Sequence, residues 1–317
     1  MNPVRLAIDV AGGDHGYQVV VSGVVDALRL NPGAFTAVLC GERGSIERAL
    51  DEVGAPADPH LTIEDCTQRI SPQDIPSRVW KQKSGAAIIR CILLQHSGEV
   101  DASISAGNTA VLMAAAVFLL GKLAHVTRPA LAAFIPTAGV RPVLLLDVGA
   151  NLECRPEHLL SFGCMGGDYA RRYHGIEAPR VSLLNVGVEP AKGTRVIFET
   201  DELLRRECRG YCGFVEGSRI LSGDTDVVVC DGYTGNALLK SFESFYGLTE
   251  SVLANDRELL ERIESSMAIL NPEKYGAVPL VGVNGVVFKA HGSASPRAIS
   301  NAIVSTVTAF NQSAIPD

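Results

Sequence analysis

The chain of 317 residues lacks the features that mark several common classes of protein. Its longest apolar run, residues 110–120, is far shorter than the ~20 residues that a membrane-spanning helix needs. Basic residues number 28 against 35 acidic ones, which does not provide the basic surface expected of a nucleic-acid-binding protein. Too few apolar residues precede Asp9 for an export signal. We therefore expect a cytoplasmic protein without a membrane span.

Cysteine chemistry and catalytic motifs are also sparse. The eight cysteines form no Cys-x-x-Cys pair, and several lie in apolar segments, which is typical of reduced, buried thiols. Cys208 and Cys212 have a helical spacing but no histidine nearby, so we expect no metal site. There is no nucleotide-binding glycine loop, no Gly-x-Ser-x-Gly elbow and no His-Glu-x-x-His motif. We expect no cofactor and no covalent nucleophile, with Cys154 beside Arg155 as the one open case.

The chain is rich instead in glycine, with 31 residues, and in short apolar runs. These runs alternate with helical patterns, which predicts an α/β fold: a largely parallel sheet covered on both faces, as a three-layer sandwich. The predicted strands are residues 5–10, 34–40, 61–64, 101–104, 142–148, 181–186, 226–230 and 280–289. The predicted helices are residues 18–30, 45–53, 84–96 and 110–120, with others beginning near 156, 194, 237 and 297. No linker or repeat is visible, so we expect one domain over residues 1–317.

Small-residue turns follow most of the predicted strands. Right-handed crossovers place such turns at the carboxyl edge of the sheet, where open α/β sheets bind ligands. Glycine amides and helix N-termini form anion sites, so we predict that these turns share a cleft that binds phosphate or a similar anion. The candidate residues, all in these turns, are Gly12, Gly13, Asp14, Ser105, Gly107, Asn108, Thr109, Gly149, Asn151, Lys192, Gly193, Asp231, Asn236 and His291.

Several of these side chains admit two interpretations. Asn108, Asn151 and Asn236 lie where helices are predicted to start, so each either caps a helix or donates to a ligand. Lys192 is predicted to start a helix and would oppose its dipole, which favours a role in neutralising a bound anion. His291 follows an apolar strand and is either a core histidine or a proton donor in the cleft.

Taken as an ordered set, the turns resemble the phosphate acyltransferase (PlsX) family of bacterial phospholipid synthesis. The matching stretches are residues 8–14, 105–109, 128–130 with Pro136, 146–151, 165–166, 183–187 with 192–193, 214–217, 231–236 with 239–240, and 280–285 with 291–292. The sequence departs from the family pattern at Ala11, at residues 110–112 and in segment 81–87. The last departure removes hydroxyl groups that the family usually carries there.

The resemblance implies a reaction and its partners. An acyl group would move from the thioester of acyl carrier protein to inorganic phosphate, and the acyl phosphate would serve phospholipid synthesis. The resemblance also implies the fold of the isocitrate and isopropylmalate dehydrogenases, a homodimer and no cofactor. A helical tip at about residues 245–280 would form part of the dimer or contact the inner face of the cell membrane peripherally. Ordinary core packing of this amphipathic region is the alternative.

This chemistry needs little acid–base machinery. Phosphate is largely ionised near pH 7 and a thiolate is a good leaving group, so catalysis consists mainly of positioning and charge stabilisation. We assign Lys192 to phosphate binding, and Asn236 and Asn108 to hydrogen bonds with phosphate or the carbonyl oxygen. His291 would protonate the leaving thiolate. The glycine turns at 12–13 and 149–151 are expected to supply backbone amides.

Two other functions remain open. A decarboxylating NAD-dependent dehydrogenase would share the fold, but it needs an acidic metal-binding cluster and a nicotinamide site that the sequence does not show. A catalytically altered scaffold that binds acyl carrier protein or a membrane is favoured only by segment 81–87. An acidic carrier would need a local basic patch on this acidic chain. Arg171-Arg172 and Arg205-Arg206 with Arg209 are candidates, unless they are only solvated helix faces.

Overall fold

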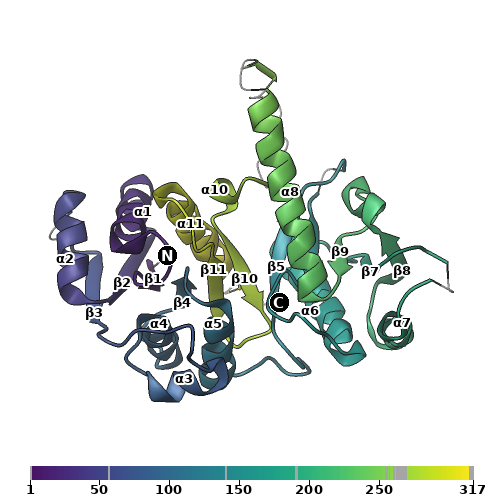
Figure 1. Cartoon of the computed structure of the whole chain (residues 1–317), viewed down its shortest axis with the longest axis horizontal. Helices are drawn as coiled ribbons and strands as arrows, with labels where there is room; N and C mark the ends of the chain where they lie inside the picture. Colours follow the sequence, from purple (N-terminus) through teal and green to yellow (C-terminus); the bar gives the residue numbers. More distant parts are fainter. Residues whose placement is uncertain are drawn as a thin grey trace. The chain divides into compact units, whose positions relative to one another are not determined.

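The computed structural model describes residues 2–55, 58–139, 141–189, 192–253, 256, 258–259, 261 and 270–313. The chain divides into two compact units (Figure 1). Unit 1 holds residues 1–121 and 272–317, and unit 2 holds residues 122–271. The expectation of one domain with a tip at about residues 245–280 stays a prediction, and much of that tip lies outside the described residues.

The sheet of unit 1 has the strand order β3-β2-β1-β4-β11-β10. Strand β10 is antiparallel to β11, and the other neighbours are parallel. The strands are β1 (Val4–Asp9), β2 (Phe35–Gly41), β3 (Leu61–Asp65), β4 (Ala102–Ser105), β10 (Ala277–Val281) and β11 (Val286–Ala290). The register pairs Asp9 with Ser105, so the turns after β1 and β4 start side by side.

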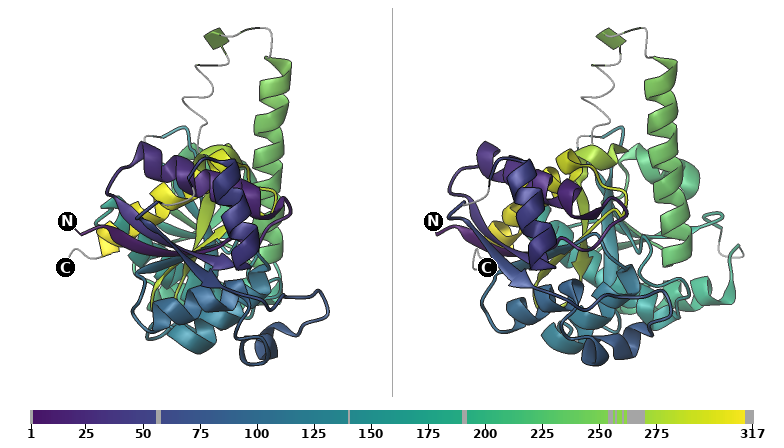
Figure 2. Two further views of the ribbon diagram at one scale, coloured as in Figure 1. Left: turned by 90° about the vertical axis from the view of Figure 1, so that its left-hand side faces the viewer. Right: turned by 60° about the vertical axis from the view of Figure 1, so that its left-hand side comes forward.

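Helices cover both faces of this sheet. They are α1 (Gly16–Leu30), α2 (Arg43–Glu52), α3 (Pro76–Gln82), α4 (Ala87–His96), α5 (Thr109–Ala115), α10 (Pro272–Tyr275) and α11 (Pro296–Ser313), and a π-helical turn, η1 (Ala116–Leu120), continues α5. Helices α1 and α11 pack together on one face, and α4 and α5 pack on the other (Figures 1 and 2). In α1, the buried residues Val20, Val24 and Leu28 recur at helical spacing and form the apolar stripe that faces the core.

The sheet of unit 2 has the order β5-β6-β9-β7-β8, with β5 antiparallel to β6 and the remaining pairs parallel. Its strands are β5 (Ala130–Ile135), β6 (Val143–Leu146), β7 (Val181–Asn185), β8 (Tyr211–Glu216) and β9 (Val227–Val229). Its helices are α6 (Pro156–His174), α7 (Arg195–Glu207) and α8 (Gly232–Val252), with a 3-10 turn, η2 (Gly217–Ser222). Helices α6 and α7 pack together, whereas α8 contacts β5 and β6 and continues past the strands of its unit (Figure 2).

The largely parallel, helix-covered architecture is confirmed, but some predicted boundaries are wrong. The run 280–289 is not one strand: β10 ends at Val281, and Gly282, with a φ of +98°, opens the turn into β11. Helix α3, which is not among the predicted helices, begins at Pro76, where the missing N–H of proline is harmless.

Two further local expectations fail in unit 2. The helix expected from residue 237 begins at Gly232, because Asp231 already supplies the N-cap. Cys208 and Cys212 do not share a helix, since Cys208 caps the end of α7 and Cys212 lies in β8. Among the described residues, no helix is long and apolar enough to cross a membrane.

Candidate active site

The turn after β1 is built around a buried carboxylate. Asp9 ends β1 and is 3% exposed. Its Oδ1 accepts the amides of Ala11 (3.2 Å) and Gly12 (2.9 Å), and its Oδ2 accepts the Ser105 hydroxyl from the end of β4 (2.6 Å). The Ser105 oxygen in turn accepts the amide of Gly107 at 2.9 Å. These bonds tie the turn after β1 to the turn after β4.

The two turns also approach each other closely as backbones. A Cβ on Gly12 would lie 2.6 Å from both the Gly107 nitrogen and the Asp9 carboxylate, so no larger residue fits there. Burial raises the pKa of Asp9, although hydrogen bonds from Ser105 and the turn amides, together with the Lys289 charge, oppose the shift. The Lys289 Nζ donates to the carbonyl of Ala106, at 3.2 Å.

The turn after β11 joins the same edge of unit 1. The Asp14 amide donates to the carbonyl of Gly292 at 2.7 Å. His291 is exposed, so its interpretation as a core histidine is wrong. Its Nδ1 accepts the amide of Ser293 (3.2 Å) and lies 2.8 Å from the Ser293 hydroxyl. A neutral ring that accepts at Nδ1 carries its proton on Nε2, which can then donate.

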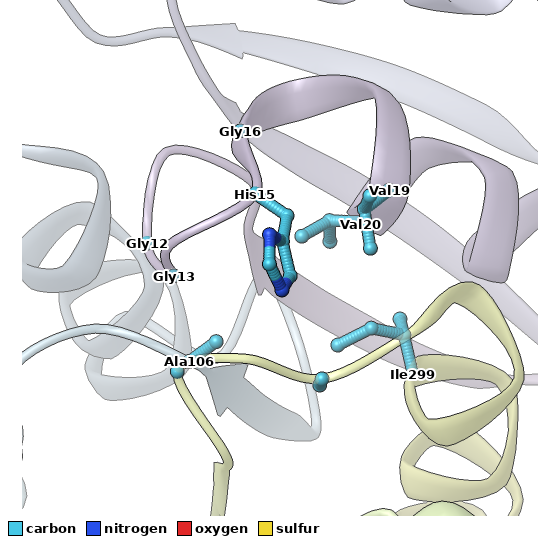
Figure 3. Close-up of a pocket in the computed structure, with 10 residues that line it drawn as sticks. Gly12, Gly13, His15, Gly16, Val19, Val20, Ala106 and Ile299 are labelled. Atoms are coloured by element: carbon cyan, nitrogen blue, oxygen red, sulfur yellow. The ribbon is translucent and has the colours of Figure 1, made fainter.

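A pocket lies among these turns of unit 1, at the start of α1 (Figure 3). His15 directly precedes α1, and its ring faces the pocket beside Gly12 and Gly13 (Figure 3). Ala106 and Gly292 also line it. Glycine is needed at position 13, where φ is +98°. His15 lies with Asp14 in the turn predicted after residues 5–10, but the sequence suggested no specific role for it.

The capping interpretation is confirmed for Asn108. Its Oδ1 accepts the amide of Val111 at 3.1 Å, so the side chain forms the N-cap of α5, whose first residue is Thr109. This cap fixes the direction in which the turn after β4 enters α5. The amide group of the side chain remains the part of Asn108 that can donate to a ligand.

In unit 2, the turn after β6 is built around a second buried carboxylate. Asp147 follows β6 directly and is 0% exposed. Its Oδ1 accepts the amides of Leu131 (3.0 Å), Gly149 (3.2 Å) and Ala150 (3.0 Å), and its Oδ2 accepts the amide (2.6 Å) and the Nδ2 (2.9 Å) of Asn151. Burial raises the pKa of Asp147, and these hydrogen bonds lower it only in part.

Asn151 is a buried structural residue rather than a helix cap. It is 3% exposed, and its Nδ2 donates to the carbonyl of Pro129 at 2.8 Å as well as to Asp147. The following helix, α6, begins later, at Pro156 after the N-cap Arg155, so the capping interpretation of Asn151 is wrong. Within the described part of the chain, its Oδ1 is a buried atom without a hydrogen-bond partner.

The start of α8 packs directly on the Asp147 turn. Asp231 caps the helix by accepting the Thr234 amide at 2.8 Å. The Gly232 amide donates to the carbonyl of Asn151 at 2.7 Å. A Cβ on Gly235 would lie 1.8 Å from the Asp147 carbonyl oxygen, so this contact requires glycine.

Asn236 therefore lies inside α8, and its interpretation as a cap is wrong. Its side chain is next to the glycine turn, because a Cβ on Gly149 would lie 3.5 Å from the Asn236 Oδ1. The structure thus brings together four predicted residues of unit 2: Gly149, Asn151, Asp231 and Asn236, at the ends of β6 and β9.

Lys192 lies in an exposed loop after β7. Its Nζ donates to Glu189 Oε1 at 2.8 Å, and this bond raises the pKa of Lys192 and lowers that of Glu189. Asn185, the last residue of β7, holds the loop by donating to the carbonyls of Gly187 (3.0 Å) and Lys192 (2.7 Å). Helix α7 starts only at Arg195, after the N-cap Thr194. The prediction that Lys192 starts a helix and opposes its dipole is therefore wrong.

The buried aspartates correct the expectation about backbone amides. The amides of Gly12, Gly149 and Asn151, which were expected to bind phosphate, already donate to Asp9 or Asp147. An aspartate two to four residues before the amides that it accepts is the pattern of an Asx turn, and this signal was available in the sequence. Lys289 was also missed, although a lysine in an otherwise apolar strand is unusual.

Metal and thiol chemistry have little support in the described residues. Within the described ranges, no group of three or more His, Cys, Asp or Glu side chains could hold a metal ion. Burial, with Asp147 and Asp231 nearby, raises the pKa of Cys154 to about 12. The thiol therefore stays protonated near neutral pH and is a poor nucleophile.

Comparison with known proteins places the chain in a family. Residues 4–315 match the sequence profile of the family described as "Fatty acid synthesis protein". The phosphate acyltransferase of Moorella thermoacetica is 39% identical, over 98% of this chain and 93% of its own length. That of Halorhodospira halophila is 37% identical, over 99% and 94%. The chain belongs to this family. It is accordingly an acyltransferase, and the resemblance seen in the turns is confirmed.

Solved structures support the fold independently of sequence. A phosphotransacetylase from Streptococcus pyogenes superimposes with a TM-score of 0.66 at 14% identity, covering 98% of this chain and 94% of its own. A 4-hydroxythreonine-4-phosphate dehydrogenase from Klebsiella pneumoniae gives 0.59 at 13% identity, covering 98% of both. At such low identity these likenesses concern the fold alone, and they confirm the predicted dehydrogenase-like α/β class.

Proposed function

We propose that this acyltransferase moves a fatty acyl group from acyl carrier protein to inorganic phosphate, giving an acyl phosphate for phospholipid synthesis. The observation that carries the proposal is identity of 34–39% to phosphate acyltransferases along almost the whole chain. A phosphate oxygen attacks the thioester carbonyl, the C–O bond forms and the C–S bond breaks. The proton of hydrogenphosphate ends on the departing sulfur.

In this scheme the turns of the sheet edge supply positioning and charge. Lys192 attracts the phosphate dianion, which takes the place of Glu189 as its partner. Asn236, at the start of α8, donates to phosphate or to the carbonyl oxygen, supported by the positive end of the helix dipole. His291 in its doubly protonated form delivers its Nε2 proton to the leaving sulfur, while its Nδ1–H can donate to the Ser293 hydroxyl, 2.8 Å away. The proton that hydrogenphosphate loses then restores the ring.

The remaining predicted residues shape these turns. Asp231 and Asn108 cap α8 and α5, while Gly13 and Gly193, with φ values of +98° and +133°, allow their loops to bend. Gly12, Ser105 and Gly149 belong to the turns that Asp9 and Asp147 hold. The chemistry requires no metal and no cofactor.

The activity is tested with palmitoyl-acyl carrier protein and phosphate, by trapping acyl phosphate with hydroxylamine and subtracting a reaction without phosphate. We expect phosphate-dependent hydroxamate from the wild type. A Lys192→Ala variant should lose about 10²–10³-fold in rate, the usual cost of removing one stabilising group. Glu189→Gln, which frees Lys192 from its ion pair, should lower the KM for phosphate. Near-full turnover by Lys192→Ala would remove Lys192 from the scheme.

The hydroxamate assay tests the scaffold function, and a separate measurement of NAD reduction tests the dehydrogenase function. A scaffold gives no phosphate-dependent hydroxamate from any thioester. A dehydrogenase reduces NAD, which an absorbance measurement detects. Among the described residues, no metal-binding cluster favours the dehydrogenase, and only the departure of segment 81–87 from the family pattern favours the scaffold.

Dimerisation and peripheral membrane contact are part of the proposal for α8. Its residues Phe245, Leu248 and Val252 are 59%, 59% and 71% exposed and recur at helical spacing on one face. Such a stripe is covered by a second copy of the chain or lies on a lipid surface. Sedimentation of the protein with anionic vesicles, beside its oligomeric state in solution, distinguishes the two.

A further inference from the structure

The surface of α3 in unit 1 combines positive charge with a half-buried tryptophan and an exposed phenylalanine. Residues 67–98 contain five basic residues and one acidic residue, in a chain whose net charge is −7. Lys83 pairs with Asp74 of the same stretch at 2.7 Å, and Arg90 pairs with Glu64 of β3 at 2.7 Å. Arg78 and Lys81 are exposed on α3, and no ion pair with a described carboxylate involves either of them.

Aromatic side chains lie beside these charges. Trp80, the only tryptophan of the chain, stacks on Phe118 of η1 with ring centroids 5.0 Å apart and an interplanar angle of 12°. The Lys81 Nζ lies 4.9 Å from the centre of the Trp80 ring. Phe118 is 51% exposed and Ile75, just before α3, is 52% exposed. An exposed apolar centre with a basic border is the composition of a protein-docking site.

We propose that this surface, defined by Ile75, Arg78, Trp80, Lys81 and Phe118 and called the α3 surface, docks the acidic acyl carrier protein. The proposal rests on the proposed function, which supplies the carrier as a substrate. Charge complementarity selects an acidic protein as the occupant, because the α3 surface is positive on an otherwise acidic chain. The tryptophan–phenylalanine pair supplies the apolar anchor.

The position of the surface suits a carrier that must deliver an acyl chain. Helix α3 packs against α5, and η1 continues α5, as the views in Figures 1 and 2 show. Phe118 lies ten residues beyond Asn108, the cap of α5. At helical rise this is about 15 Å along the axis from the turn after β4. When a carrier is bound at the α3 surface, its long prosthetic group can therefore extend along α5 toward that turn.

Three of the five arginines in the other two basic clusters have carboxylate partners of their own. Arg171 pairs with Asp168 at 2.8 Å, Arg205 with Asp201 at 2.8 Å, and Arg206 with Glu207 at 2.6 Å. Each of these arginines thus has a carboxylate partner of its own, which reduces the field that it presents to an acidic protein. The α3 surface is therefore a better candidate than the arginine clusters considered from the sequence.

A charge-reversal pair tests the assignment. The variant Arg78→Glu/Lys81→Glu changes the α3 surface, and Arg171→Glu/Arg172→Glu on α6 makes the same change of charge elsewhere. The readouts are kcat and KM for palmitoyl-acyl carrier protein and for palmitoyl-coenzyme A, a thioester without the carrier. We expect the α3 variant to raise the KM for the carrier thioester about tenfold or more. In the α3 variant the KM for the coenzyme A thioester should change less than twofold. The α6 variant should change neither of the two KM values.

Trp80 gives a direct measure of docking that does not depend on turnover. Titration with a tryptophan-free acyl carrier protein should change Trp80 emission in the wild type and in the α6 variant. The change should weaken in the α3 variant and with added salt. If neither thioester is turned over by the wild type, the proposed function fails, and the titration still decides whether the carrier docks here.

Three outcomes would overturn the proposal. In the first, the α6 variant loses carrier affinity and the α3 variant does not. In the second, Trp80 emission responds to anionic vesicles but not to the carrier, which makes the surface a lipid contact. In the third, the α3 variant changes the oligomeric state and leaves the carrier KM unchanged, which makes it an interface between copies of the chain.

Discussion

Asp9 in unit 1 and Asp147 in unit 2 occupy equivalent places at the carboxyl ends of parallel strands. Both are buried, and burial raises the pKa of both. Their surroundings differ, however. Asp147 accepts five hydrogen bonds from N–H groups, four of them backbone amides. Asp9 accepts only two amides, and its other oxygen accepts a serine hydroxyl.

The difference concerns how easily each turn can change. A backbone N–H is fixed and can only donate, whereas a hydroxyl can rotate and accept instead. The Asp147 turn also carries the start of α8 through Gly232 and Gly235, while the Asp9 turn is linked to the turn after β4 by the Ser105 hydroxyl and by a close backbone approach at Gly12. We therefore expect the Asp147 turn to hold Asn236 rigidly. In the Asp9 turn, the Ser105 hydroxyl can reorient.

The largest effect is expected from Gly235→Ala. The added methyl group would lie 1.8 Å from the Asp147 carbonyl oxygen, so α8 must move off the turn. We expect a loss of about 4 kcal/mol or more in the free energy of unfolding by urea. Gly247→Ala, in the same helix but with open space around the site, is the control. It should stabilise the protein by up to about 1 kcal/mol, and equal losses in both variants would contradict the packing argument.

Asp147→Asn should follow in size. The new amide group would face N–H donors, because both carboxylate oxygens accept from N–H groups. We expect a loss of about 3 kcal/mol, from buried donors left without an acceptor. Asp9→Asn should cost about 1 kcal/mol or less, since the Ser105 hydroxyl can rotate to accept from the new amide. A cost for Asp9→Asn as large as that for Asp147→Asn would show that the hydroxyl does not adapt.

Ser105→Ala should have a smaller effect. It removes the hydroxyl that bridges Asp9 and the Gly107 amide, and we expect a loss of about 1–2 kcal/mol. Ser103→Ala is the control, because Ser103 is buried in the same strand but donates to the Cys91 carbonyl rather than to a carboxylate. Its loss in urea unfolding should be smaller.

The pH dependence of stability should show the smallest effect. Asp9 has a raised pKa in the folded state, so the folded protein holds this proton to a higher pH than the unfolded chain. The stabilisation of the folded state by this bound proton is complete below the ordinary aspartate pKa of about 3.9. It is lost as the pH rises through the pKa of Asp9 in the folded protein. The wild type should therefore lose stability relative to Asp9→Asn between pH 4 and pH 7. A constant difference between the two unfolding free energies over this range would contradict a raised pKa.

Much of the fold could be read from residue patterns. Apolar runs such as residues 142–148 predict β6 because a strand buried on both faces is continuously apolar. Errors arose where one apolar run contains a turn, as at Gly282, and where a cap precedes the expected start of a helix, as at Asp231. The periodicity of apolar residues does not reveal such a turn, because the run stays apolar across it. It does not reveal such a cap either, because the cap acts through one hydrogen bond.

The sequence by itself determined the family, the α/β class and the order of the turns that carry Lys192, Asn236 and His291. These follow from composition, periodicity and the order of short motifs, all of which are local properties. Only the tertiary structure decided that Asp9 and Asp147 accept hydrogen bonds from the backbone amides of the glycine turns, and that Glu189 pairs with Lys192. Only the structure, likewise, placed Trp80 against Phe118, 38 residues away in the chain. Hydrogen bonds, burial and stacking depend on distances between atoms, and the order of residues does not fix those distances until the chain has folded.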